Sequence, residues 1–114
     1  MPNVLIIDDD AALVRMLRLT LRDGGFDVSS ASNGREGLER VADHEPDVIV
    51  LDLQMPVMDG ATFYRELRSR GFEIPVLVLS ARGARPAQRE LKAEAYLDKP
   101  FRPDDLVREV ARLA

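Results

Sequence analysis

Three short runs of apolar residues constrain the fold more than any other feature of the sequence. They cover residues 4–7, 48–51 and 76–79, consist of Val, Ile and Leu, and show no alternation of polar and apolar positions. Such runs are typical of strands that are buried on both faces of a parallel sheet. Each is far shorter than the roughly 20 residues that a membrane-spanning helix needs. We therefore expect an α/β protein with helices on both sides of the sheet.

Segments with helical periodicity separate these runs. The first ends at a Gly pair, residues 24–25, and one of its faces carries Leu13, Met16, Leu17, Thr20 and Leu21. Further helices are expected after Asn33, which forms a capping-box pattern with Glu36, after the loop at 54–60, within 86–91 and from Pro103 onward. Weaker strand patterns lie at 26–30 and 95–97. The alternation predicts five strands and five helices joined as right-handed βαβ units.

Polar residues terminate the strands that we expect near the centre of the sheet. The strand ends are Asp8-Asp9, Asp52, Ser80 and Lys99. Because the carboxyl ends of parallel strands share one edge, three carboxylates, a hydroxyl and an ammonium should meet in one crevice. Oxygen ligands of this kind suit Mg²⁺, and the lysine suits a phosphoryl group, which an aspartate can accept. Asp10 is interpreted as an N-cap of the first helix rather than as a ligand.

Composition excludes several other functions. The chain has no Cys and a single His, His44, so thiolate chemistry and multi-histidine metal sites are excluded. The net charge of −4 argues against direct binding of nucleic acid. The N-terminus shows neither the basic segment nor the long apolar segment of a secretory signal, and no stretch suits a membrane, so we expect a cytoplasmic protein.

Four segments carry a resemblance to a known family. They are residues 5–10 (LIIDDD), 52–60 (DLQMPVMDG), 79–81 (LSA) and 95–101 (AYLDKPF). With these segments in this order at the expected strand ends, residues 1–114 resemble one receiver domain of two-component response regulators. The resemblance implies a flavodoxin-like (βα)5 three-layer sandwich with a parallel sheet of order 2-1-3-4-5.

The same resemblance implies the chemistry of the crevice. Asp52 is implied to accept a phosphoryl group from a histidine kinase, a phosphotransfer protein or a small donor such as acetyl phosphate. Asp8, Asp9 and Asp52, with the backbone carbonyl of Gln54, are implied to bind Mg²⁺, with Mn²⁺ as a substitute. Lys99 is implied to pair with the phosphoryl oxygens. The activity would be limited to the chain's own phosphorylation and slow dephosphorylation.

A conformational switch is also implied. Ser80 is expected to move its hydroxyl toward the phosphoryl group, and Tyr96 to turn inward in response. The peptide bond before Pro100 is expected to be cis, as is typical of the family. The switch would control an effector domain or a protein partner, with a phosphorylation-dependent homodimer as a further expectation.

The chain departs from the family after Ser80. The spacing to Lys99 is shorter by about three residues, roughly one helical turn, and Lys92 stands where Gly is common. This shortening falls within residues 82–89, and the resemblance implies that this region belongs to the face through which receiver domains usually signal. Arg82, Arg85 and Arg89 make the stretch locally basic, and we interpret them as a solvated face.

Two other functions remain as alternatives. A receiver-like module could bind a partner without phosphorylation, although the complete acidic set argues against this. A phosphatase of the dehalogenase type would need a second Asp two residues after Asp52, where Gln54 stands. A dinucleotide or flavin site is excluded, because residues 8–10 would repel phosphate and no Gly-x-Gly follows the first strand.

Overall fold

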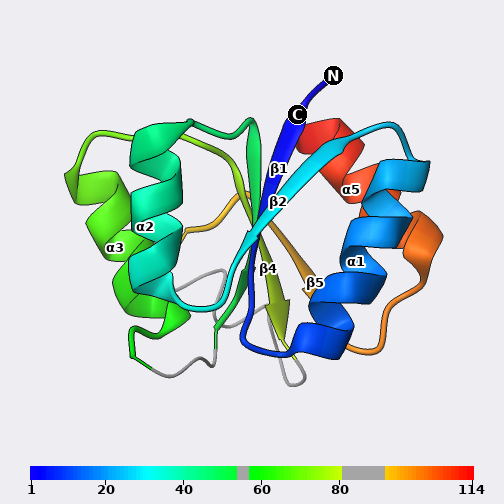
Figure 1. The fold of residues 1–114 in the computed structure, drawn as a ribbon, viewed down its shortest axis with the longest axis horizontal. Coiled ribbons are helices and arrows are strands. Elements are labelled where there is room, and N and C mark those ends of the chain that lie inside the picture. Colours follow the sequence, from blue (N-terminus) through cyan, green and yellow to red (C-terminus); the bar gives the residue numbers. More distant parts are fainter. Residues whose placement is uncertain (54–56, 81–91) are drawn as a thin grey trace.

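The strands pair in parallel in the order β2-β1-β3-β4-β5 in the computed structural model, which describes residues 1–53, 57–80 and 92–114. The strand bounds are β1 Asn3–Ile7, β2 Asp27–Ala31, β3 Val48–Asp52, β4 Val76–Ser80 and β5 Ala95–Asp98. This order confirms the predicted flavodoxin-like sheet. The strands point toward the lower edge of Figure 1, where their carboxyl ends meet.

Helices cover both faces of the sheet (Figure 1). On one face lie α2 (Gly34–Asp43) and α3 (Gly60–Ser69), and on the other lie α1 (Ala11–Asp23) and α5 (Pro103–Leu113). The short helix expected within 86–91 falls outside the described residues. Over the described part of the chain, no helix is both long and apolar enough to cross a membrane.

The central strands β1 and β3 explain why the apolar runs show no alternation. Alternate residues of each strand face opposite helix layers. The core beneath α2 and α3 contains Leu5, Ile7, Ile49 and Leu51, and the core beneath α1 and α5 contains Val4, Ile6, Val48 and Val50. All eight are no more than 1% exposed. Both faces of the two strands are therefore inside the protein, and every position must be apolar.

Short polar side chains begin three of the helices. Asp10 accepts hydrogen bonds from the backbone N–H groups of Ala12 and Leu13, which confirms its interpretation as an N-cap. Asn33 caps α2 by accepting a hydrogen bond from the N–H of Glu36, which is one of the two contacts of the predicted capping box. The Glu36 carboxylate instead accepts from the Ser32 hydroxyl. Asp59 caps α3 through the N–H of Thr62. Each of the three caps satisfies donors that a helix end leaves without intrahelical partners.

The expected face of α1 is partly wrong. Leu17 and Leu21 are buried as predicted, but Met16 is 40% exposed. Leu13 and Val14 pack against the core with Leu17 and Leu21. Met16 lies about 100° around the helix from Leu17. Apolar character alone could not decide which of two adjacent residues faces the core.

Candidate functional site

The three predicted carboxylates meet at the carboxyl edge of the sheet. Asp8 directly follows β1, Asp9 is the next residue, and Asp52 ends β3, the strand beside β1. One carboxylate oxygen from each lies within 4.8 Å of the others. The sequence therefore predicted this cluster correctly.

Lys99 lies within reach of two of these acids. Its Nζ atom is 3.8 Å from Asp8 Oδ2 and 3.8 Å from Asp52 Oδ1. The residue follows β5, and the Lys99–Pro100 peptide bond is cis, as expected. An ammonium at this distance offsets part of the negative charge without being fully engaged by either carboxylate.

Burial distinguishes the carboxylates from one another. Asp8 is 3% exposed and Asp52 is 8% exposed, whereas Asp9 is exposed. The pKa of Asp8 is raised to about 6. Burial is the largest cause, because the ionised form loses hydration, and the charges of Asp52 and Asp9 act in the same direction. The Asp10 backbone N–H, which donates to Asp8 Oδ1 at 3.0 Å, and Lys99 both lower this pKa.

A divalent cation fits this arrangement. Asp8 Oδ2 is a buried oxygen that accepts no hydrogen bond within the described part of the chain. A buried carboxylate oxygen without a hydrogen-bond donor is costly, and a cation bound by oxygen ligands would remove that cost. The donor set, which consists of carboxylates only, suits Mg²⁺ better than a metal that prefers sulfur or nitrogen.

Gly60 brings α3 close to Asp52, a contact that the sequence interpretation did not assign. A Cβ atom at Gly60 would lie 2.6 Å from the backbone oxygen of Asp52 and 2.7 Å from the Cα of Leu53. Gly60 N–H also donates to the Leu53 carbonyl at 3.0 Å. Only glycine fits so close to backbone atoms, and the Asp59-Gly60 pair before a helical pattern was the available signal.

The other predicted site residues are placed only in part. Tyr96 lies on β5, is half-buried and packs against the core beneath α2 and α3. Ser80 ends β4 opposite Asp98, but its side chain lies outside the described part of the structure. Gln54 also lies outside the described residues. His44 is an exposed residue at the end of α2.

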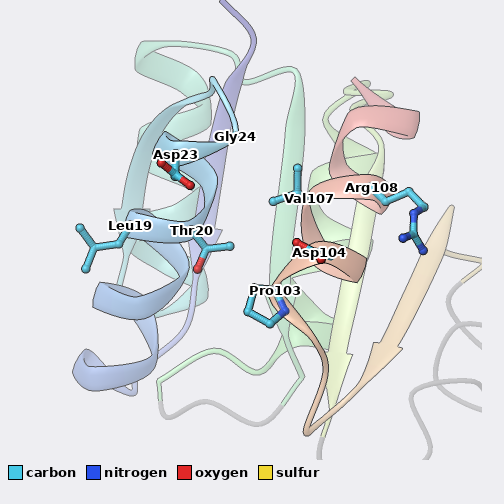
Figure 2. A pocket seen from close by; sticks show the side chains of 8 residues that line it. All are labelled: Leu19, Thr20, Asp23, Gly24, Pro103, Asp104, Val107 and Arg108. Atoms are coloured by element: carbon cyan, nitrogen blue, oxygen red, sulfur yellow. The ribbon is translucent and has the colours of Figure 1, made fainter.

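A separate groove follows the seam between α1 and α5 (Figure 2). The groove is open to solvent, has a volume of about 690 Å³, and its lining includes Leu19, Gly24 and Val107. It includes none of the strand-end residues described above. The acidic crevice is therefore the candidate functional site.

Comparison with known proteins identifies this arrangement. The family model described as "Response regulator receiver domain" matches residues 4–111. Among curated proteins, the transcriptional regulatory protein PrrA of Mycobacterium leprae is 44% identical over 98% of this chain and 49% of its own length. This chain thus spans about half the length of the curated relatives it matches.

Solved structures agree with this match. The receiver domain of the Francisella response regulator 1452 is 33% identical, with a TM-score of 0.92 over 99% of this chain and 96% of that one. The response regulator protein TrrA of Thermotoga maritima, solved in complex with Mg(2+)-BeF, is 27% identical, with a TM-score of 0.91 over 100% of both chains. Receiver domains bind Mg²⁺ at the acidic site.

Proposed function

The chain belongs to the family of response regulator receiver domains, which act in phosphorylation-dependent signalling, and from this premise we propose that Asp52 is its phosphoacceptor. One observation carries the proposal. Asp52 is an almost buried carboxylate at the carboxyl end of a central strand, with two further carboxylates and the Lys99 ammonium around it. This combination suits transfer of a phosphoryl group to an aspartate.

The transfer needs little covalent machinery from the protein. An Asp52 carboxylate oxygen attacks phosphorus, and the bond from phosphorus to the donor breaks. With phosphohistidine, the departing imidazole nitrogen keeps the electron pair, and with acetyl phosphate the departing acetate oxygen keeps it. Lys99 Nζ, 3.8 Å from Asp52 Oδ1, would neutralise charge on the phosphoryl oxygens.

Asp8, Asp9 and Asp52 would hold the Mg²⁺ ion, with the Gln54 carbonyl as a further ligand. When bound, the ion supplies positive charge that offsets the repulsion between acids and phosphoryl oxygens. Mn²⁺ would substitute, because it also prefers carboxylate and carbonyl oxygens. Asp8 contributes a buried oxygen and Asp9 an exposed one.

Phosphorylation would change the conformation through Ser80 and Tyr96. We propose that the Ser80 hydroxyl hydrogen-bonds the phosphoryl group and that Tyr96, half-buried on the neighbouring strand, turns inward. The register that places Ser80 opposite Asp98 brings the end of β4 beside β5 and supports this coupling.

We propose a histidine kinase or phosphotransfer protein as the donor, and an effector domain or protein partner as the target. The relative PrrA is described as a transcriptional regulatory protein, and we propose a transcriptional output here as well. A phosphorylation-dependent homodimer is also proposed, without a commitment to its interface. Because these donors present the phosphoryl group inside the cell, we propose a cytoplasmic location.

Acetyl phosphate and Mg²⁺ provide a direct test. Intact-protein mass spectrometry should show one added phosphoryl group on the wild type and none on Asp52→Asn. Asp10→Asn is the matched control, because it makes the same chemical change at a helix cap outside the cluster. An unchanged wild-type mass, under conditions that modify another receiver domain, would refute the proposal.

The phosphate-independent module is not favoured, because it gives no reason for a cluster of three carboxylates with Lys99 beside two of them. Equal binding of a partner by the wild type and by Asp52→Ala, with and without acetyl phosphate, would support it instead.

A further inference from the structure

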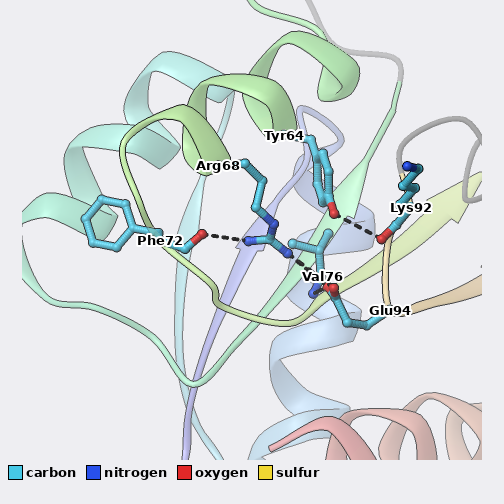
Figure 3. Close-up of polar contacts among 6 residues, drawn as sticks. All are labelled: Tyr64, Arg68, Phe72, Val76, Lys92 and Glu94. Atoms are coloured by element: carbon cyan, nitrogen blue, oxygen red, sulfur yellow. Dashed lines mark hydrogen bonds and ion pairs between the residues drawn. The ribbon is translucent and has the colours of Figure 1, made fainter.

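A network of polar contacts joins α3 to the segment that enters β5 (Figure 3). Arg68 donates from Nη1 to the Phe72 carbonyl oxygen at 3.1 Å and from Nη2 to the Glu94 carboxylate at 3.0 and 3.4 Å. Its Cζ atom lies 4.7 Å from the centroid of the Tyr64 ring. The planar guanidinium is thereby fixed by a carbonyl, a carboxylate and an aromatic ring.

Glu94 connects Arg68 to the beginning of β4. Its Oε1 atom, which is bound to Arg68, also accepts a hydrogen bond from the Val76 N–H at 2.7 Å. Val76 is the first residue of β4, and the ladder with β5 begins one residue later, where Leu77 lies opposite Ala95. The Glu94 carboxylate therefore ties the two strands together before their backbones pair.

Tyr64 holds the turn immediately before β5. Its hydroxyl donates to the Lys92 carbonyl oxygen at 3.1 Å. Lys92 has φ = 62°, in the left-handed region that residues with a Cβ rarely adopt. Two side chains of α3, Tyr64 and Arg68, thus fix the direction in which the chain enters β5.

Strand β5 depends on these side-chain contacts for its position more than β1 and β3 would, because it has fewer strand neighbours. It spans four residues and pairs only with β4, because it lies at the edge of the sheet. It contains Tyr96 and leads directly to Lys99. By contrast, Asp8 and Asp52 follow or end strands that are paired on both sides.

We propose that Arg68 and Tyr64 are positioning residues for Lys99 and Tyr96. By fixing the entry of β5, they set where the Lys99 ammonium lies relative to a phosphoryl group on Asp52. Neither side chain would touch the reacting atoms. This inference rests on the proposed function, in which Lys99 pairs with the phosphoryl oxygens.

The test compares Arg68→Gln with Arg70→Gln in the full chain. Arg70 is the matched control, because it follows α3 directly and its ion pair is with Glu66, a residue of the same helix. Two quantities are measured: the initial rate of phosphorylation by acetyl phosphate at saturating Mg²⁺, and the Kd of Mg²⁺ alone by calorimetry. Urea unfolding gives the folded fraction, so that rates are expressed per folded molecule.

Arg68→Gln should lower the phosphorylation rate at least about threefold, since small misplacements of a charged group are costly in transfer reactions. The Kd of Mg²⁺ should rise by no more than a factor of about two, because the carboxylates belong to β1 and β3 and keep their positions. A displaced Lys99 ammonium opposes the cation less, so tighter Mg²⁺ binding would support the proposal. Arg70→Gln should match the wild type in both quantities. Tyr64→Phe, which removes only the hydroxyl, should lower the rate in the same direction.

Wild-type rates per folded molecule in both Arg68→Gln and Tyr64→Phe would overturn the proposal. Parallel losses of rate and Mg²⁺ affinity would also overturn it, because they would indicate damage to the whole site. If the wild type itself takes no phosphoryl group, the proposed function fails and this inference falls with it.

Discussion

Replacing Asp8 with Asn should stabilise the metal-free protein. Asp8 is 3% exposed, and one of its oxygens accepts no hydrogen bond within the described residues. Asn has nearly the same shape, keeps an oxygen to accept the Asp10 N–H, and carries no charge. The substitution therefore removes a buried charge with little loss of packing.

The pKa of Asp8 gives the size and the pH dependence of this effect. A rise from 3.8 to about 6 on folding corresponds to about 3 kcal/mol of unfolding free energy at neutral pH. Water at the mouth of the crevice screens the charge, so we expect about 2 kcal/mol. Because the folded-state pKa is raised, the stabilising effect of protonating Asp8 is fully present below 3.8 and is lost as pH rises through about 6. The advantage of Asp8→Asn should thus be greatest above pH 7 and shrink toward pH 4.

Urea unfolding followed by circular dichroism, in the presence of a chelator, measures this difference. At pH 7.5 the midpoint of Asp8→Asn should exceed the wild-type midpoint by about 1 M. Asp10→Asn, an exposed cap that keeps its hydrogen-bonding oxygen, should lie within about 0.5 kcal/mol of the wild type. An Asp8→Asn variant that is no more stable than the wild type at pH 7.5 would refute the reasoning. So would an advantage that grows as the pH falls.

Three further predictions concern single substitutions at Gly60, Asn33 and Lys99. Gly60→Ala should destabilise the fold by more than about 2 kcal/mol in urea unfolding, because its Cβ would lie 2.6 Å from the Asp52 backbone oxygen. The control is Gly24→Ala, whose Cβ would lie closest to a Val107 side-chain atom, at 3.0 Å. An effect of Gly60→Ala no larger than that of the control would contradict this prediction. Asn33→Ala should cost about 1 kcal/mol through loss of the α2 cap, whereas Asn33→Asp should cost little. Lys99→Ala should bind Mg²⁺ more tightly in calorimetry, because the ammonium 3.8 Å from Asp8 and Asp52 no longer opposes the cation. The rate of its phosphorylation by acetyl phosphate should fall. Weaker Mg²⁺ binding would show that Lys99 instead holds the carboxylates in place.

Most of the fold could be predicted because its main signals are local. The unbroken apolar runs at 4–7 and 48–51 indicate strands buried on both faces, and the structure buries them there. The helix starts at Asp10 and Asn33 were also visible, since capping needs only a polar side chain at one position. Met16 shows the limit of this approach, because an apolar residue beside the buried face of a helix can remain exposed.

The site could be predicted where it depends on topology and not where it depends on distant contacts. Parallel pairing brings strand ends to one edge, so Asp8, Asp52 and Lys99 were expected together without any knowledge of distances. The contact of Gly60 with the Asp52 backbone depends on the path of a loop. The contact between Arg68 and Glu94 joins residues 26 positions apart and leaves no periodic pattern in the sequence.

The position of each charged residue in the sheet indicates which parts of the site are rigid and which can move. Asp8 follows β1 and Asp52 ends β3, and both strands are paired on both sides. The packed core therefore fixes the positions of the two carboxylates, although their charges repel each other. Lys99 follows a four-residue edge strand that is held on one side by β4 and at its entry by α3. A phosphoryl group on Asp52 would therefore act on the less constrained partner, because moving Lys99 and Tyr96 disturbs one strand pairing, whereas moving the acids would disturb the whole sheet.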